Sequence, residues 1–169
     1  PANEKIIEAN LERLRLLGQW GRGRVEGLAW SPDGARVAVA TPLGVFVYDA
    51  VSLAAPLWLQ TQEPAYRLAW SPDGKRLAVD TAGPGSGADM FIPPHLVQIW
   101  DVAGGAPLVT LDTGTQALAL RFRNADELVV LARAQGGATF QRWDVAAGQR
   151  VQIINLLGGE NAMAGDLTS

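Results

Sequence analysis

The stretch LAWSPDG occurs twice in this 169-residue chain, at Leu28–Gly34 and again at Leu68–Gly74, forty positions apart. In Ser-Pro-Asp-Gly, proline presets φ, serine and aspartate can bond to the local backbone, and glycine accepts the positive φ that closes a tight turn. Short runs rich in Val, Leu, Ala and aromatic residues flank each copy. The repeated stretch therefore predicts two β-hairpins built to one plan.

Two further strands are predicted after each hairpin. The third strand ends in an aromatic residue and aspartate, as GVFVYDA, LVQIWDV and FQRWDV, and the fourth reads PLWLQT, PLVTLDT and RVQIINL. The third unit has RFRNADEL in place of the turn, and Phe122 stands where the others have Trp30 and Trp70. The pattern predicts three units of four antiparallel strands, with a period near forty residues and an insertion in the middle unit.

Several strands are apolar at nearly every position, which is typical of sheets covered on both faces. Five of the six tryptophans lie at or beside the expected strands. Each of them buries on the order of 150–250 Å², enough to dominate packing between sheets. We therefore expect an all-β fold, a β-propeller whose four-stranded antiparallel blades stack radially around an axis.

The pairs Trp100-Asp101 and Trp143-Asp144, the four-strand unit and the SPDG turn together resemble WD40 repeats in a bacterial form, from about Leu14 to Asn155. The TolB-type propeller repeat, with its W-S-P-D-G-x-R-L-A signature, is the competing resemblance, and the Trp-Asp pairs favour WD40. The family's Gly-His pair is missing, because the only histidine, His95, lies in the insertion. Blades without the family's His–Asp–Trp tetrad are expected to depend on packing and turns.

The resemblance implies a division of the chain into an arm, blades and a start of a further blade. The expected parts are an N-terminal helix or arm at 1–13, a closing strand at 14–23, blade 1 at 24–62, blade 2 at 63–113 with its insertion at 81–95, blade 3 at 114–157, and the start of a fourth blade at 162–169. Propellers usually have 4–8 blades. We therefore expect a piece of a longer propeller, or a homodimer in which open blade edges associate to complete the ring.

Composition excludes several classes of function. A net charge of −3 with no basic run argues against a nucleic-acid binder. The chain has no cysteine, hence no disulfide and no thiolate metal site. No stretch approaches the roughly 18 apolar residues that a membrane span needs. The compartment stays open between the cytoplasm and an extracytoplasmic location, because a leader could have preceded Pro1.

No catalytic constellation is found in the sequence. The recurring aspartates occupy the same places in each repeat, so we expect turn and cap residues; they are Asp33, Asp49, Asp73, Asp101 and Asp144. The Gly-rich stretch at 83–87 lacks the Lys-Ser/Thr of a phosphate loop and the spacing of a nucleophile elbow. His95 has only Asp80 and Asp89 nearby in sequence, too few for a metal site. We expect a protein that is not an enzyme and that has neither cofactor nor metal.

The insertion Thr81–His95 is the most distinctive feature outside the repeats, with a flexible Gly-rich start and an apolar tip. The resemblance places it on the partner-binding top face, and packing on its own blade is the alternative. The expected partner-binding residues are Glu63, Tyr66, Met90, Phe91, His95 and Gln116. The predicted function is a non-catalytic scaffold for a protein or peptide. The alternatives are a regulatory or sensor segment of a larger bacterial signalling protein, an extracytoplasmic TolB-like propeller, and an enzymatic propeller with an axial metal.

Overall fold

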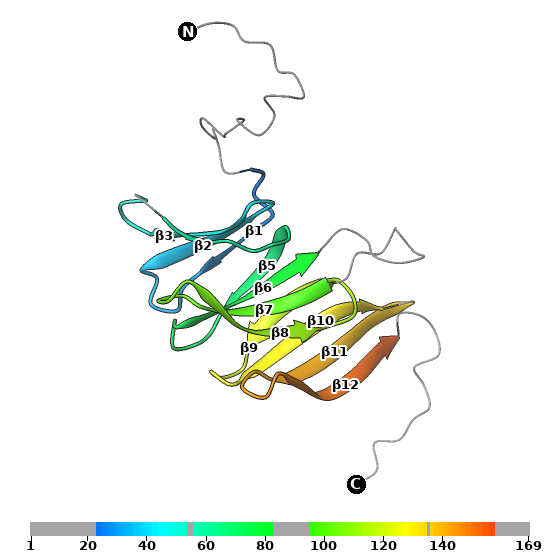
Figure 1. Cartoon of the computed structure of the whole chain (residues 1–169). Coiled ribbons are helices and arrows are strands. Elements are labelled where there is room, and N and C mark those ends of the chain that lie inside the picture. Colours follow the sequence, from blue (N-terminus) through cyan, green and yellow to red (C-terminus); the bar gives the residue numbers. More distant parts are fainter. Residues whose placement is uncertain (1–22, 54–55, 83–94, 135, 158–169) are drawn as a thin grey trace, which may run out of the picture.

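The computed structural model describes residues 23–53, 56–82, 95–134 and 136–157 (Figure 1), which form twelve strands in three antiparallel sheets. Blade 1 contains β1 (Gly27–Trp30), β2 (Arg36–Thr41), β3 (Gly44–Asp49) and β4 (Leu57–Leu59). Blade 2 contains β5 (Ala65–Trp70), β6 (Arg76–Ala82), β7 (His95–Asp101) and β8 (Ala106–Asp112). Blade 3 contains β9 (Ala117–Phe122), β10 (Glu127–Ala134), β11 (Gly137–Asp144) and β12 (Gln149–Leu157). In every blade the strands pair in chain order.

The predicted all-β fold of three four-stranded antiparallel blades is confirmed. One boundary is corrected: Thr81 is part of β6 and His95 is the first residue of β7, paired with Ala82, so the connection between these strands spans 83–94. Apolar and β-branched residues next to a paired strand extend the pairing further than the change in composition indicated. The predicted arm, closing strand and start of a further blade, at 1–22 and 162–169, lie outside the described residues.

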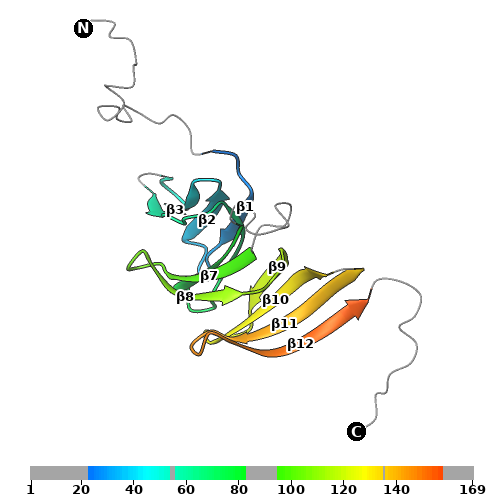
Figure 2. The same cartoon turned by 45° about the vertical axis from the view of Figure 1, so that its right-hand side comes forward.

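The three blades lie side by side in chain order (Figures 1 and 2), and the first strand of each blade contacts the first strand of the next. We call the face turned towards the preceding blade the front face and the opposite face the back face. One buried cluster joins Ala38, Ala40 and Val47 on the back of blade 1 to Trp70 and Leu77 on the front of blade 2. A second joins the back of blade 2 to the front of blade 3. Burial on both faces explains the nearly unbroken apolar strands.

The repeated Ser-Pro-Asp-Gly turns form as predicted. The Gly34 amide donates to the Ser31 carbonyl over 2.9 Å, and Gly34 has a φ of +70°. The Ser31 hydroxyl and the Ala35 amide both donate to the Asp33 carboxylate, and these bonds lower the pKa of Asp33. The second copy repeats the arrangement through Ser71 and Asp73. Each turn thus satisfies its own polar groups.

The tryptophans of the Trp-Asp pairs bond to a glutamine two residues earlier on the same strand. Trp100 Nε1 donates to Gln98 Oε1 over 3.1 Å, and Trp143 Nε1 donates to Gln141 Oε1 over 3.1 Å. A buried indole N–H needs an acceptor. In blades 2 and 3 a Gln-x-Trp pattern supplies that acceptor within one strand.

A tryptophan and an arginine connect blade 1 to blade 2. Trp70 Nε1 donates to the Ala29 carbonyl over 3.0 Å. Arg36 lies 4.9 Å over the Trp70 ring and donates to the Gly74 carbonyl over 2.8 Å. Arg76 repeats this reach in blade 2 and donates to the Ala125 carbonyl of blade 3 over 2.8 Å. The arginines at the start of β2 and β6 therefore hold the first turn of the next blade.

Candidate functional site

The two ends of the blades differ in how their connections are held. In an antiparallel sheet that follows chain order, alternate connections lie at opposite ends. We call the end with the β1–β2 and β3–β4 connections, and their counterparts in blades 2 and 3, the turn end. The opposite end, with the β2–β3 and β4–β5 connections and their counterparts, is the loop end.

Aspartate side chains at the turn end are occupied by the backbone around them. Asp49 accepts from the amides of Val51 and Ser52, Asp101 from that of Gly104, and Asp144 from that of Ala147. The bonds from Ser52 lower the pKa of Asp49. The interpretation of these aspartates as turn and cap residues is confirmed, and their carboxylates are occupied by hydrogen bonds within their own turns.

At the loop end, a threonine fixes the connection between successive blades. The Thr61 hydroxyl donates to the Glu63 carbonyl over 2.7 Å, and the equivalent Thr113 hydroxyl contacts the Thr115 carbonyl over 3.1 Å. Both threonines are buried. Thr113 also bonds to the His95 carbonyl, so the link between blades 2 and 3 is fastened to the start of β7. These bonds give the loop end a fixed backbone on which side chains can be presented.

Three of the predicted binding residues lie in or next to these inter-blade connections. Glu63 is in the β4–β5 connection, Tyr66 is in β5, and Gln116 is in the β8–β9 connection; all three are half-buried. The Tyr66 carbonyl lies against Gly27 of β1, so close that a Cβ on Gly27 would collide with it. The Gln116 carbonyl accepts from the Arg133 amide over 2.9 Å. All three backbones are therefore tied to the blades.

The other three predicted binding residues do not lie in these inter-blade connections of the described structure. Met90 and Phe91 lie outside the described residues. His95 was expected in the insertion, but it is a strand residue, buried, with its side chain on the back face of blade 2. It shares that face with Val97 and Ile99, because alternate residues of a strand point to the same side.

A buried pair of titratable groups occupies the junction between blades 2 and 3. Asp80 of β6 is 0% exposed, and its Oδ1 lies 3.7 Å from Nδ1 of His95. Within the described residues, neither carboxylate oxygen nor this nitrogen has a hydrogen-bond partner. Burial raises the pKa of Asp80 to about 7, against smaller opposing effects of the Ala117 amide and the Arg67 charge. Burial lowers the pKa of His95. In the sequence Asp80 and His95 are only near each other along the chain, and nothing there predicts that they are buried as a pair.

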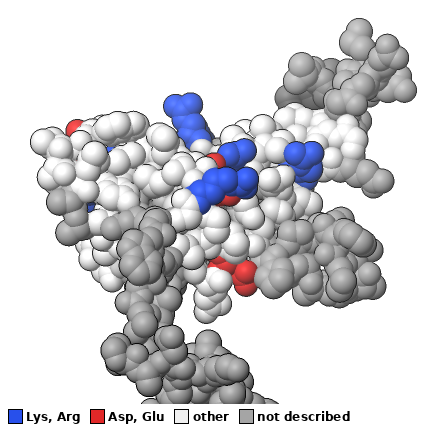
Figure 3. Space-filling view, turned by 90° about the horizontal axis from the view of Figure 1, so that it is seen from above, with Lys and Arg blue, Asp and Glu red and all other residues white. Residues whose placement is uncertain are grey.

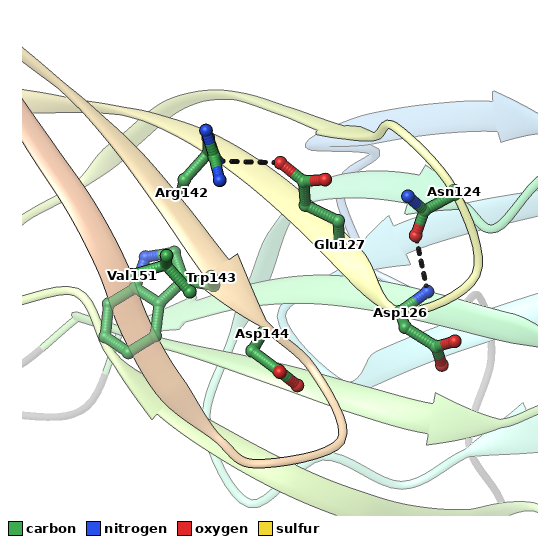
Figure 4. A pocket seen from close by; sticks show the side chains of 7 residues that line it. All are labelled: Asn124, Asp126, Glu127, Arg142, Trp143, Asp144 and Val151. Atoms are coloured by element: carbon green, nitrogen blue, oxygen red, sulfur yellow. Dashed lines mark hydrogen bonds and ion pairs between the residues drawn. The ribbon is translucent and has the colours of Figure 1, made fainter.

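A hollow of about 260 Å³ lies on blade 3 at the turn end (Figure 4). Figure 4 shows Arg142 and Glu127 pointing towards each other across one side, with Arg142 Nε 2.8 Å from Glu127 Oε1. Asn124 accepts from the Asp126 amide on the other side. Arg142 and Glu127 therefore pair with each other, and the Asn124 side chain is occupied within its own turn.

Charged side chains are sparse on the face in Figure 3, where basic side chains gather near the centre beside a few acidic ones and most of the surface is uncharged. Among the described residues no group of three or more His, Asp or Glu side chains could hold a metal ion. No described helix is long and apolar enough to cross a membrane.

Comparison with known proteins gives matches in structure and none in sequence. No family profile matches the chain, and no curated protein is similar to it in sequence. The structure is similar to the WD40 repeats of RRP9, with a TM-score of 0.62, 18% identity, and coverage of 83% of this chain and 40% of that one. It is similar to U3-55K, with a TM-score of 0.62, 18% identity, and coverage of 83% and 41%.

A third similar structure is the Cps50 (Swd1) β-propeller domain of Myceliophteria thermophila, with a TM-score of 0.64, 14% identity, and coverage of 87% of this chain and 44% of that domain. The chain thus spans less than half the length of each of these structures. At these identities the likeness concerns the fold. The described blades have the fold of a WD40-repeat β-propeller, as the resemblance implied.

Two features of the site were missed by the sequence reasoning but left a signal in the sequence. Asp80 is a lone charged residue in the apolar run RLAVDTA, and such a residue in a doubly covered strand must be buried. The Gln-x-Trp spacing appears at Gln98 and at Gln141. The lone charge of Asp80 does not identify His95 as its neighbour, because that contact depends on the pairing of β6 with β7.

Proposed function

We propose that this chain is a non-catalytic scaffold that binds a protein or peptide at the loop end of its blades. The observation that carries the proposal is the contrast between the two ends. Turn-end aspartates bond to their own turns, whereas Glu63, Tyr66 and Gln116 are half-buried side chains on loop-end backbone that Thr61 and Thr113 hold in place. Recognition surfaces are commonly loops positioned by a rigid scaffold.

The chemistry of this end suits an uncharged or weakly basic peptide. Glu63 supplies an acceptor, Gln116 supplies both a donor and an acceptor, and Tyr66 supplies a ring with a polar tip. Arg67 next to it is exposed and adds one cationic group. Side chains of this kind, with few charges, form the core of many peptide-binding surfaces.

A peptide library displayed on phage tests the proposal, with the immobilised chain as bait. Peptides selected on the parent chain should lose at least tenfold in affinity for the Tyr66→Ala and Gln116→Ala variants. The matched control is Lys75→Ala, an exposed residue of a turn-end hairpin, which should leave affinity unchanged. Failure to select any peptide, or equal losses at Lys75, would overturn the proposal.

A second proposal concerns the ring, and one residue favours it. Trp30 is 58% exposed, whereas Trp70 at the same position of the next blade is 8% exposed under blade 1. We infer that the front face of blade 1 is covered by another blade in the working protein, so that this chain acts as a segment of a larger propeller. Mass spectrometry of the protein from its native host decides this: a longer product supports the proposal, and a product of this length that remains monomeric contradicts it.

A further inference from the structure

The outermost strand of blade 3 differs from its counterparts in length and in protection. β12 has nine residues, against seven in β8 and three in β4. Among the described strands it pairs with β11 on one side only, because it ends the order of its sheet. A long strand with one unpaired edge is a template for another strand unless something blocks it.

Alignment through the neighbouring strand shows which protective residues β12 lacks. Trp100 pairs with Pro107 in blade 2, and Trp143 pairs with Arg150 in blade 3. Counting from there, Thr110 and Asp112 of β8 correspond to Ile153 and Asn155 of β12. Proline and aspartate at the β8 edge are two of the devices that prevent pairing between sheet edges. Neither is present at these positions of β12.

The exposed side chains of β12 are apolar on both faces of the sheet. Val151, Ile153, Ile154 and Leu156 are all exposed. Ile153 pairs with Gln141, whose side chain faces blade 2, and Ile154 pairs with Phe140 on the opposite face. A strand added at this edge would therefore gain apolar contacts on both sides, as well as backbone hydrogen bonds.

We propose that β12 pairs antiparallel with β12 of a second copy of this chain, joining two third blades into one continuous eight-stranded sheet. A two-fold axis perpendicular to the sheet keeps the faces in register, so that front-face residues meet front-face residues. The segment from Val151 to Asn155 carries no charge, and hence no like charges oppose each other across the axis. This edge lies at the outside of the blade, so the pairing leaves the loop end free and is independent of the proposed binding function.

The composition of the edge favours a second copy over an unrelated peptide. A strand that is apolar on both faces pairs best with another strand that is apolar on both faces. The same strand in a second copy of the chain meets this requirement. Pairing also removes from water the apolar residues that the edge exposes. An unrelated extended peptide is the competing occupant and gives a different result below.

The test measures the molar mass of the chain by sedimentation velocity over a dilution series. The parent chain is expected to dimerise. The double variant Ile153→Thr, Asn155→Asp gives β12 the residues that β8 has at these positions, and it should weaken the dimer at least tenfold. The matched control is Leu108→Thr, which removes an equally exposed apolar residue from the edge of blade 2 and should leave the dimer intact.

Two further results locate the contact. Hydrogen exchange should show β12 amides that become protected as the concentration rises, while β8 amides do not change. A dimer that is lost in Trp30→Lys and kept in the double variant would overturn the proposal, because it would place the contact on the front face of blade 1. A chain that stays monomeric at all concentrations would also overturn it, including one that captures an extended peptide at β12.

Discussion

The junction between blades 1 and 2 and the junction between blades 2 and 3 follow one plan but differ in polarity. At the first, the back face of blade 1 is built from Ala38, Ala40 and Val47, and Trp70 packs on it. At the second, the Asp80 carboxylate and Nδ1 of His95 are buried without hydrogen-bond partners among the described residues, and Phe122 takes the place of tryptophan.

The two junctions differ in the energetic cost of their buried polar groups. An unpaired buried polar group costs about 1–3 kcal/mol, and the described residues of the first junction include none of this kind. The second junction therefore carries an energetic cost, from Asp80 and His95, that the first lacks among the described residues. The predictions that follow test this contrast.

Substitution of Trp70 should have the largest effect. Trp70→Ala removes a buried indole and its bond to Ala29, and it should lower the free energy of unfolding by about 3–5 kcal/mol. Urea denaturation measures the loss. Trp30→Ala is the control at the same position of an exposed face and should cost no more than about 1 kcal/mol, because little of that side chain is buried. Equal losses would show that the first junction does not depend on Trp70.

A methyl group at Gly27 should separate the first strands of blades 1 and 2. In Gly27→Ala the new Cβ would collide with the backbone carbonyl of Tyr66, which cannot move without β5. We expect a loss of about 2–3 kcal/mol, in the range for overpacked sites. Chemical denaturation measures it, and Ala29→Gly at a neighbouring position of β1 should cost only about 1 kcal/mol. A neutral Gly27→Ala would contradict the close approach.

The two connecting arginines compare the junctions at the turn end. Arg36→Ala loses a bond to the Gly74 carbonyl and the stacking on Trp70, whereas Arg76→Ala loses a bond to the Ala125 carbonyl and an ion pair with Asp126. Each should cost about 1–2 kcal/mol, with Arg36 the larger because of the ring contact. Thermal unfolding of both variants ranks them. The reverse order would indicate that charge pairing outweighs ring stacking at this end.

The dependence of stability on pH should show the smallest effect and isolate the second junction. Folding raises the pKa of Asp80 from 3.8 to about 7, so between these values the folded state holds the extra proton, and stability falls as pH rises. His95 has the opposite sign: its pKa is lowered, so its contribution grows as pH rises and is complete about one pH unit above its unfolded value of 6.5.

Above pH 6.5 Asp80 makes the larger contribution, because only the second half of the unfolded-state titration of His95 remains. Between pH 6.5 and pH 8 proton linkage removes roughly 0.8 kcal/mol at Asp80 and returns roughly 0.4 kcal/mol at His95, so the chain should lose about 0.4 kcal/mol. Urea midpoints at the two pH values measure the loss, which should be absent in Asp80→Asn. The exposed Asp33→Asn, whose pKa is lowered, should retain the loss. A variant at Asp80 that keeps it would assign the titration to another group.

The sequence predicted the blade plan because its signals are local. The Ser-Pro-Asp-Gly turns need only neighbouring residues, and Trp100-Asp101 and Trp143-Asp144 mark the ends of third strands directly. The same locality explains why the structural role of the recurring aspartates was predicted correctly.

The polar features of the candidate site depend on contacts between residues distant in the chain. Asp80 meets His95 only because β6 and β7 pair, and both are buried only because blade 3 covers them. His95 directly follows Pro93-Pro94 at the end of the predicted insertion, but its pairing with Ala82 makes it the first residue of β7. The spacing of residues along the sequence does not reveal the register in which β6 and β7 pair.

The connecting arginine bears on how such a chain can grow by duplication. Blade 2 carries both halves of the connection: the Gly74 carbonyl accepts from the blade before it, and Arg76 donates to the blade after it. A tandem copy of blade 2 would therefore be compatible with itself. Blade 3 keeps the accepting carbonyl of Ala125, but it has Glu127 where the others have arginine, paired inward with Arg142. A duplicated blade 3 would therefore lack the arginine that holds the first turn of the next blade, whereas a duplicated blade 2 would keep it.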